Sequence, residues 1–322
     1  MDAVTEAAET AYTRYDCSDH TDAETLTAAA EAAHRAISRG ECIVLPTDTV
    51  YGIGADAFDA AAVQRLLEAK GRGRDMPPPV LIADTRLLRA LAADVPADAR
   101  VLVAAFWPGP LTVICKSQPS LRMDLGDTDG TIALRVPDHE LARQLLRKTG
   151  PMAVSSANLS GKPAALTCDD AIDMLGDSVA VYLDGGGLQP GAVDSAPSTI
   201  VDFSRTEHGR ILRRGALSLD QLREHCPDLE DLVVEPVAVD SPPVDSAAAR
   251  TDPAATGAAS ADRKHPGRAR RYRHTLQPPP ADTVVDHELA ADDLEDADDV
   301  KAAIQNWPSE LGPSESPPQQ AP

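Results

Sequence analysis

Three cations stand within five residues at Lys70, Arg72 and Arg74, separated by the glycines Gly71 and Gly73. The run follows a helical pattern of apolar residues and leads into a stretch of prolines. Arginine matches phosphate oxygens with two parallel hydrogen bonds and lysine adds a point charge, so this spacing favours a phosphate ligand. Cations at the end of a helix also interact with the helix dipole, but that effect is smaller.

A second polar segment, 46–56, leaves a short apolar strand and offers small hydroxyl side chains such as Thr49. Loops at strand ends are favoured binding sites in α/β proteins, although a polar turn with structural glycines would have a similar sequence. The hexapeptide 52–57 also matches the dinucleotide-binding pattern G-x-G-x-x-A. That pattern requires an acidic residue about 20 positions further on, where this chain carries the cationic run, so a dinucleotide site is disfavoured.

A third polar segment, 154–163, begins as an apolar strand ends and contains Ser155, Ser156 and Asn158. Hydroxyl and amide groups in this position can hydrogen-bond a phosphate or an adenosine, although they could equally cap the strand. No G-x-S-x-G surrounds either serine, which argues against a serine hydrolase.

Other chemical classes lack their signatures. The sequence contains no Walker A motif, no H-E-x-x-H and no C-x-x-C, and its five cysteines are widely spaced. ATP use of the P-loop type, a zincin site and a zinc ribbon are therefore disfavoured.

The formal net charge of −21 opposes long-range attraction of nucleic acid or an anionic membrane. A site for a polyanion such as ATP must then be a local cluster of Lys and Arg. We find no long apolar run and no signal-peptide segment, so we expect a cytoplasmic protein without membrane contact.

Strand and helix patterns alternate between these polar segments. Strands are expected at 42–45, 80–82, 111–115, 131–136, 152–155, 179–183, 199–203 and 210–212. Helices are expected at 22–39, 60–69 and 138–148, with a last one from about residue 218. This alternation predicts an α/β or α+β layered domain.

We expect the domain to cover residues 21–226, after a flexible N-terminus at 1–20. Across 227–322 Pro, Ala, Ser and acidic residues dominate and apolar periodicity ends. Such a segment cannot bury enough surface to offset chain entropy, so it is predicted to be disordered. A basic run at 263–274 inside it could touch RNA or an acidic partner, or pair with the acidic stretch that follows.

Several motifs, in their order along the chain, resemble the YrdC/TsaC family of threonylcarbamoyl-AMP synthases. They are PTDTVYGIGADAF from Pro46, AKGR from Ala69, WPGPLTVI from Trp107, TIALRVP from Thr131, SSANLSGKP from Ser155, PSTIVDF from Pro197 and ILRRG from Ile211. The resemblance runs from about residue 28 to residue 222. An ordered set of this kind is far more specific than any one motif.

The resemblance implies a single-domain, YrdC-like twisted mixed open sheet with surrounding helices and a concave cationic groove. It further implies ATP, L-threonine and bicarbonate as substrates, with Mg²⁺ accompanying ATP and pyrophosphate as by-product. The product would serve t6A modification of tRNA, with tRNA or t6A transferase proteins as downstream partners.

Roles for individual residues also come from the resemblance. Thr49, Arg135 and Ser198 would contact threonine, with Arg135 holding its carboxylate. Lys70 and Arg72 would be catalytic and face the ATP phosphates. The nucleotide side would be completed by Thr131, Ser156, Asn158 and Arg213.

Many relatives carry a histidine near the threonine where this chain has Leu81, so the amino-acid preference stays open. An RNA-binding module that kept the fold and lost catalysis is the main alternative. The polar set Thr49, Ser156 and Asn158 exceeds what a bare RNA groove needs. A carbamoyl-transfer domain of the hydrogenase-maturation kind is a further alternative, but its usual zinc-finger cysteines are missing.

Overall fold

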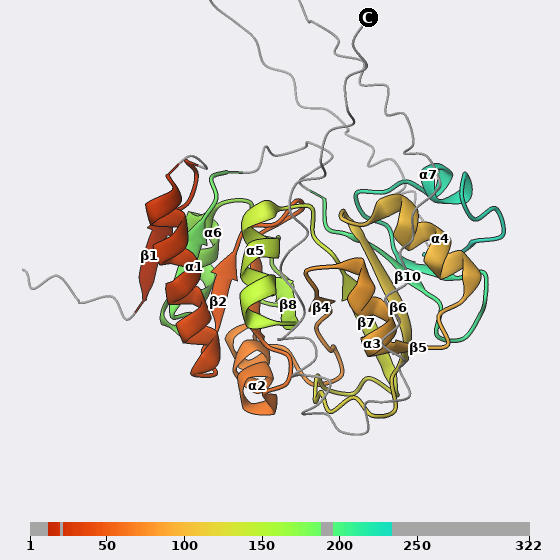
Figure 1. The fold of residues 1–322 in the computed structure, drawn as a ribbon, viewed down its shortest axis with the longest axis horizontal. Helices are drawn as coiled ribbons and strands as arrows, with labels where there is room; N and C mark the ends of the chain where they lie inside the picture. Colours follow the sequence, from red (N-terminus) through yellow and green to blue (C-terminus); the bar gives the residue numbers. More distant parts are fainter. Residues whose placement is uncertain (1–11, 20–21, 188–195, 234–322) are drawn as a thin grey trace, which may run out of the picture. The chain divides into compact units, whose positions relative to one another are not determined.

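Residues 12–19, 22–187 and 196–233 are the part of the chain that the computed structural model describes. They build one mixed sheet in the order β1-β9-β2-β3-β8-β4-β7-β6-β10-β11-β12, with β5 paired to β6 beside this path (Figure 1). The strands are β1 (Thr13–Asp16), β2 (Ile43–Leu45), β3 (Gly52–Asp56), β4 (Val80–Leu81), β5 (Ala92–Ala93), β6 (Leu111–Ser117), β7 (Thr131–Arg135), β8 (Met152–Ser156), β9 (Val181–Asp184), β10 (Thr199–Asp202), β11 (Arg210–Arg213) and β12 (Glu230–Asp231). Neighbouring strands pair both in parallel and antiparallel: β6 and β7 run antiparallel, whereas β6 and β10 run parallel.

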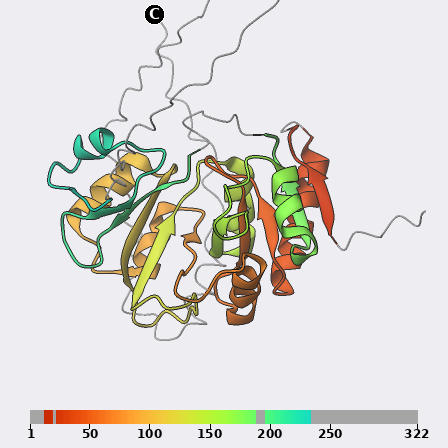
Figure 2. The same ribbon diagram turned by 180° about the vertical axis from the view of Figure 1, so that it is seen from behind.

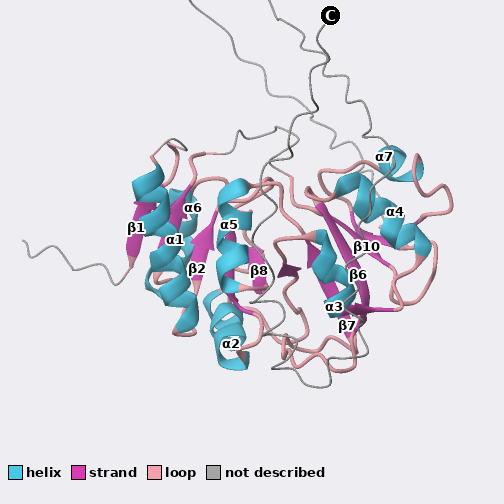
Figure 3. Ribbon diagram, viewed as in Figure 1, coloured by secondary structure: helices cyan, strands magenta, loops and turns pink. Residues whose placement is uncertain are grey.

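Helices flank the sheet, drawn in cyan beside the magenta strands in Figure 3. They are α1 (Ala23–Ser38), α2 (Ala60–Ala69), α3 (Leu88–Leu91), α4 (Ala97–Phe106), α5 (Glu140–Thr149), α6 (Cys168–Leu175) and α7 (Leu219–Arg223), with short 3-10 turns η1 (Thr85–Leu87) and η2 (Gly176–Ser178). Seen from behind, the C-terminal strands in blue-green lie at the opposite end of the sheet from the red β1 (Figure 2). Among the described residues, no helix has the length and apolar character needed to cross a membrane.

The two faces of the sheet carry different helices, because successive side chains of a strand point to opposite faces. Ile43 and Leu45 of β2 pack in one buried cluster with α1 and α5. Val44, between them, belongs to the other cluster, which takes in residues of α2, α3, α4, α6 and α7. β4 divides in the same way, with Leu81 in the first cluster and Val80 in the second.

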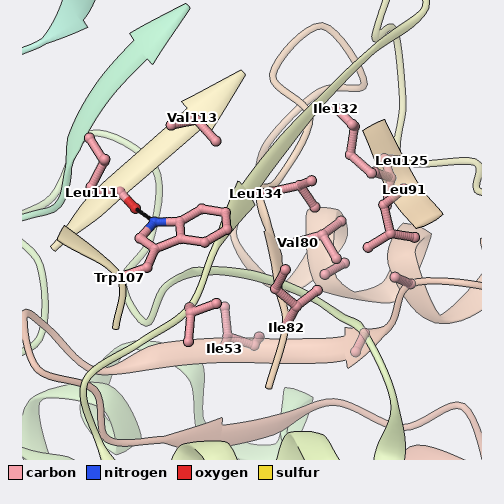
Figure 4. Close-up of a cluster of buried hydrophobic side chains, with 14 of the residues drawn as sticks. Ile53, Val80, Ile82, Leu91, Trp107, Leu111, Val113, Leu125, Ile132 and Leu134 are labelled. Atoms are coloured by element: carbon pink, nitrogen blue, oxygen red, sulfur yellow. Dashed lines mark hydrogen bonds between the residues drawn. The ribbon is translucent and has the colours of Figure 1, made fainter. Parts of the chain in front are cut away.

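Figure 4 shows part of the second cluster, where Val80 and Ile82 face Leu134 of β7. Trp107 lies at its edge, and its indole N–H donates to the carbonyl of Leu111 at 2.7 Å. A buried indole N–H without an acceptor would be costly, so this bond lets the ring fill the core. The strands that carry the functional residues are anchored by this cluster.

α1 covers only the end of the sheet around β9 and β2. Asp22 caps its N-terminus by accepting the backbone N–H of Thr25 at 3.1 Å. Its buried side consists of alanines and Ile37, in the spacing that the sequence predicts. Together with α5 it leaves the same face of β7, β6 and β10 without a covering helix, because the cluster of α1 and α5 contains no residue of these three strands.

The expected α/β class and twisted mixed sheet are confirmed, as is the helix at 60–69 with both of its ends. One expectation was wrong, within the segment 46–56, and one helix, which begins at Cys168, was not predicted. Residues 52–56 form strand β3, between β2 and β8, rather than a turn. Helix α6 went unpredicted, although Thr167 and Asp170 form a capping box at its start.

The predicted domain, residues 21–226, is too short at both ends. β1 pairs in parallel with β9, and Cys17 just after it is fully buried, so residues 13–17 belong to the domain rather than to a flexible N-terminus. At the other end β12 pairs with β11 beyond residue 226. The predicted disordered segment from 234 onward and its basic run at 263–274 lie outside the described residues.

Candidate active site

A cavity of about 480 Å³ lies on the sheet face that α1 and α5 leave open. Most of its floor comes from alternate residues of β6 and β7, which are Thr112, Ile114, Thr131, Ala133 and Arg135, while Ile132 of the opposite core also borders it. The residues that alternate with them, such as Val113 and Leu134, point into the opposite core. The cavity thus follows from strand periodicity: one face of each strand is core and the other is binding surface.

Most residues that the resemblance singles out line this cavity, although they are far apart in the sequence. They are Thr49, Arg72, Thr131, Arg135, Ser156, Asn158, Ser198 and Arg213. Three separate polar segments, 46–56, 70–74 and 154–163, contribute to its walls. The fold therefore brings the three segments together around one cavity.

Arg135, at the end of β7, is the most deeply buried cation of the cavity, with 6% of its surface exposed. Its Nη2 forms an ion pair of 2.6 Å with Asp48, its Nη1 donates to Thr49 Oγ1 at 3.0 Å, and its Nε donates to the Gly109 carbonyl at 3.0 Å. Burial lowers the pKa of Arg135 while Asp48 raises it, and a guanidinium stays protonated under either influence. Three of its five N–H groups are engaged, so two remain for an anion.

Thr47 organises the loop that carries Thr49. Its hydroxyl donates to the Val50 carbonyl at 2.6 Å and lies 3.1 Å from the hydroxyl of Thr49. The same oxygen accepts the backbone N–H groups of Thr49 and Val50 at 3.2 and 3.3 Å. This ST-type turn fixes the Thr49 hydroxyl in the cavity wall beside Arg135.

Ser198 and Arg213 form the wall on the side of β10 and β11. The Arg213 guanidinium donates to the Ser198 carbonyl at 2.8 and 3.0 Å and to its hydroxyl at 3.0 Å. The Ser198 hydroxyl also lies 2.8 Å from Thr112 Oγ1. Burial, and then the nearby charges of Arg135 and Arg72, lower the pKa of Arg213. Three guanidiniums therefore act on one another in this cavity, and an anion placed among them would relieve the repulsion.

Arg72 reaches the cavity from the loop after α2. Its Nη1 donates to the Ser155 hydroxyl at 3.1 Å, while its buried Nε has no partner. Burial lowers the pKa of this group, with the nearby Asp75 acting in the opposite sense. A buried N–H without an acceptor is costly, so Nε is suited to a ligand oxygen.

Lys70 does not face the cavity, and the expectation that it would face phosphates is corrected. It occupies the C-cap of α2, is completely buried, and directs its Nζ to the backbone carbonyls of Ser156 and of Asn158, the latter at 2.7 Å. Burial, followed by the charge of Arg72, lowers the pKa of Lys70 to about 7. Lys70 therefore lies on the core side of the loop that carries Ser156 and Asn158, and its hydrogen bonds stabilise that loop.

Asn158 is buried, and its amide donates to the carbonyls of Leu159 and Lys162 at 2.9 and 2.7 Å. Its Oδ1 is buried without a donor. Thr131, at the start of β7 in the floor, is half-buried, and its hydroxyl donates to the Thr128 carbonyl at 2.7 Å. An unpaired acceptor in Asn158 suits a ligand N–H, such as an exocyclic amine, rather than a phosphate.

Leu81 is buried and lines the cavity at the point where relatives were expected to carry a histidine. It pairs with Arg135 across β4 and β7, so its side chain supplies an apolar wall beside the buried guanidinium.

Two residues near the site had no predicted role, namely Asp48, which pairs with Arg135, and Tyr51, which is fully buried. Both stand in the motif from Pro46, which was the available signal.

The residues lining the cavity include no Asp or Glu. Among the described residues, no group of three or more His, Cys, Asp and Glu could hold a metal ion. Mg²⁺ in nucleotide sites is held largely by the phosphates and water, with few protein ligands. The polar groups that the lining offers are hydroxyls, amides and cations, among them the hydroxyl of Ser156.

Residues 35–215 match the family model Sua5_yciO_yrdC, described as "Telomere recombination". A protein of Mycobacterium tuberculosis is 48% identical over 210 residues, which are 65% of this chain and 93% of that protein. The threonylcarbamoyl-AMP synthase of Pyrococcus abyssi is 37% identical over 190 residues, 58% of this chain and 54% of that relative. The chain thus spans almost the whole of the mycobacterial relative and about half of the archaeal one.

Solved structures resemble the fold. The P. abyssi Sua5 structure in complex with L-threonine gives a TM-score of 0.61 at 31% identity, covering 68% of this chain and 62% of that chain. Escherichia coli YciO gives a TM-score of 0.54 at 24% identity, covering 61% of this chain and 93% of that chain, which is a likeness of fold alone.

Proposed function

Because this chain belongs to the Sua5/YciO/YrdC family, we propose that it is an L-threonylcarbamoyladenylate synthase, a nucleotidyltransferase that forms threonylcarbamoyl-AMP and pyrophosphate from L-threonine, bicarbonate and ATP. The observation that carries the proposal is the meeting of Arg72, Arg135 and Arg213 in one cavity of a chain whose net charge is −21. A site of this kind is suited to bring two anionic reactants together.

The reaction proceeds in two steps. The threonine amine attacks the carbon of bicarbonate, and loss of water leaves an N-carboxylate. One oxygen of this carboxylate attacks the α-phosphorus of ATP, and the bond to the β-phosphate oxygen breaks, which releases pyrophosphate. No side chain forms a covalent bond, so the protein contributes positioning and charge neutralisation.

The contacts suggest how the cavity divides. The two unused N–H groups of Arg135 and the hydroxyls of Thr49 and Ser198 would hold the threonine carboxylate and side chain. Arg72 and Arg213 would face the phosphates. These two subsites share the floor of β6 and β7, so the N-carboxylate would lie next to the α-phosphate.

Ser156 and Asn158 of one wall, together with Thr131 of the floor, would complete the nucleotide subsite. Mg²⁺ would enter with ATP and neutralise its phosphate oxygens, which lowers the repulsion of the incoming carboxylate. The product would pass to a tRNA-modifying transferase, and we place the protein in the cytoplasm.

Leu81 bears on the amino-acid preference. It offers methyl groups and no hydrogen bond to the threonine side of the cavity. Serine lacks the γ-methyl group of threonine, and the loss of one methyl contact costs about 1 kcal/mol. We therefore expect threonine to be favoured over serine by about fivefold to tenfold in kcat/KM.

The proposal is tested by pyrophosphate release from ATP and Mg²⁺, with threonine and bicarbonate each present or omitted. Release that requires both substrates is the expected result, and mass spectrometry should identify threonylcarbamoyl-AMP. A folded protein that releases no pyrophosphate under these conditions would contradict the proposal and favour the non-catalytic RNA-binding alternative, which a labelled tRNA would then test.

A further inference from the structure

Tyr51 has a place in the structure that the proposed reaction does not use. The side chain is fully buried, yet the residue is part of the cavity lining. Tyr51 follows directly after the loop 47–50, which belongs to the proposed subsite for the substrate threonine.

The backbone of Tyr51 joins this loop to the nucleotide wall. Its carbonyl accepts the N–H of Ala157 at 2.8 Å, and its own N–H donates to the Ala165 carbonyl at 3.1 Å. Ala157 stands between Ser156 and Asn158, two of the residues assigned to the nucleotide. Any shift of Tyr51 therefore moves both walls.

The side-chain hydroxyl of Tyr51 fixes it to the end of β9. It donates to the Gly186 carbonyl at 2.6 Å, accepts the Gly185 N–H at 2.9 Å, and lies 3.2 Å from Asp184 Oδ1. Gly185 cannot be replaced easily at this contact, because a Cβ there would lie 2.7 Å from Pro46 Cγ. Burial and the charge of Asp184 raise the pKa of the Tyr51 hydroxyl, so it stays a donor.

Asp184 is in turn held from the edge of the sheet by Arg14 of β1. The Arg14 Nε donates to Asp184 Oδ2 at 3.1 Å, its Nη2 contacts the same oxygen, and its Nη1 pairs with Asp169 at 2.7 Å. Asp184 is mostly buried, with 15% of its side chain exposed, whereas Arg14 is 41% exposed, so the pair joins the surface of the edge strand to the interior. The edge strand β1 is thereby connected to the cavity through two side chains.

We propose that Tyr51 is a positioning residue, held by the Arg14–Asp184 pair, which sets the distance between the threonine wall and the nucleotide wall. The inference rests on the proposed function, because its consequence is the alignment of the N-carboxylate with the α-phosphate. Misalignment of reactants that are both still bound reduces the rate of the chemical step more than it reduces binding.

The test compares Tyr51→Phe with Tyr182→Phe. Tyr182 is equally buried and its hydroxyl donates to the Gly176 carbonyl at 2.7 Å, but it does not line the cavity. Each variant removes one hydroxyl, but Tyr51→Phe breaks three contacts and Tyr182→Phe breaks one, so the stability of both variants is measured and kcat is compared at a temperature at which both are folded. We expect Tyr51→Phe alone to lower kcat by about tenfold, while KM for ATP and for threonine each change by less than about threefold.

Arg14→Met is the second variant, since it lies on the sheet edge and leaves the core intact. It should lower kcat in the same sense by a smaller factor, about threefold. Equal kcat values for Tyr51→Phe and Tyr182→Phe would overturn the inference, as would a change confined to KM.

Hydrogen exchange separates this inference from the proposed function. Amides of 47–50 and 156–158 should exchange faster in Tyr51→Phe than in wild type or Tyr182→Phe, whatever reaction the protein catalyses. Wild type that releases no pyrophosphate would defeat the proposed function alone. Unchanged exchange at both segments would defeat the positioning role.

Discussion

At the scale of single residues, Arg72 is the side chain whose contacts most clearly await a ligand. Its Nε is buried without an acceptor, and its only described side-chain hydrogen bond goes to Ser155. Hydrogen bonds to charged groups contribute about 2 kcal/mol, so Arg72→Ala should lower kcat/KM for ATP by about 30-fold.

The control for Arg72→Ala is Arg74→Ala, two residues further along. Arg74 forms an exposed ion pair with Asp124 and does not line the cavity. Such a pair contributes little, so this variant should keep ATP kinetics within about twofold of wild type. Steady-state pyrophosphate release measures both, and equal effects of the two variants would contradict the phosphate assignment.

Lys70 should make the stability of the domain depend on pH. Its pKa is lowered to about 7 by burial and by Arg72, compared with about 10.4 in an unfolded chain. Between these two pKa values the unfolded chain binds more protons, so the free energy of unfolding rises with pH across this window. Lys70→Met removes this contribution and should flatten the rise.

Urea denaturation of wild type and Lys70→Met, near pH 7 and at about pH 9, measures the difference. The wild type should gain more stability than the variant between the two conditions. If the free energy of unfolding changed with pH equally in both proteins, Lys70 would remain charged in the folded state, bonded to its two carbonyl partners. A loss of activity in the variant is also expected, because the nucleotide loop loses its support.

At the scale of elements, β3 shows why a glycine-rich strand was interpreted as a turn. Glycine weakens a strand when only propensity is considered. Here β3 lies between β2 and β8, and a Cβ on Gly52 would come within 2.7 Å of Val154 Cγ1. Close packing against the neighbouring strand therefore requires glycine at position 52, and the sequence of β3 alone does not reveal this contact.

Gly52→Ala should therefore destabilise the domain by about 1–3 kcal/mol, since the stiff β-branched Val154 cannot move aside. Gly54→Ala is the matched control: its Cβ would first meet Met152 Cε at 2.6 Å, the free end of a flexible side chain, and should cost less. Urea denaturation of both variants, and of Gly52→Ala combined with Val154→Ala, measures this. If the loss of unfolding free energy in the double variant equals the sum of the losses in Gly52→Ala and Val154→Ala, the contact between these two side chains is not the cause.

The edges of the sheet were the least predictable elements. The residues of β1 are mostly exposed and show no apolar alternation, so the strand depends on its pairing with β9 and on Arg14. Interior strands with buried Val, Ile and Leu, such as β2 and β6, lie close to their predicted positions, whereas the glycine-rich β3 does not. α6 could have been found, because Thr167 and Asp170 have capping-box spacing.

The site was predictable to a different degree. Residue types and spacing alone indicate a phosphate ligand near Arg72, but they cannot bring together Arg135 and Arg213, which lie on different strands. Only the ordered motifs placed these residues in one site. Lys70 was misassigned because its C-cap position turns the side chain inward, which depends on the loop packed above it.

At the scale of the whole molecule, the C-terminal boundary of the domain is decided by contacts that follow residue 227. The side chain of Leu229 is buried, and its backbone carbonyl accepts a hydrogen bond from Arg223 Nη2 at 2.9 Å. Asp231 of β12 pairs with Arg214 at 2.7 Å. β12 also covers the backbone edge of β11, the strand that carries Arg213. Residues 228–233 thus stabilise one wall of the cavity.

A chain that ends at Pro227 should accordingly unfold at a temperature several degrees lower than a chain that ends at Val233. The shorter chain loses one buried leucine and a mostly buried ion-pair partner, together about 2–3 kcal/mol, which in a domain of this size lowers Tm by roughly 5–10 °C. Its kcat/KM for ATP should fall as well, because β11 becomes a free edge and Arg213 loses its support. Thermal scans and pyrophosphate release on both chains, with the full-length protein as reference, measure these effects. If the two chains unfolded at the same temperature, β12 would contribute nothing to the domain, and the boundary near residue 226 that the sequence favours would be restored.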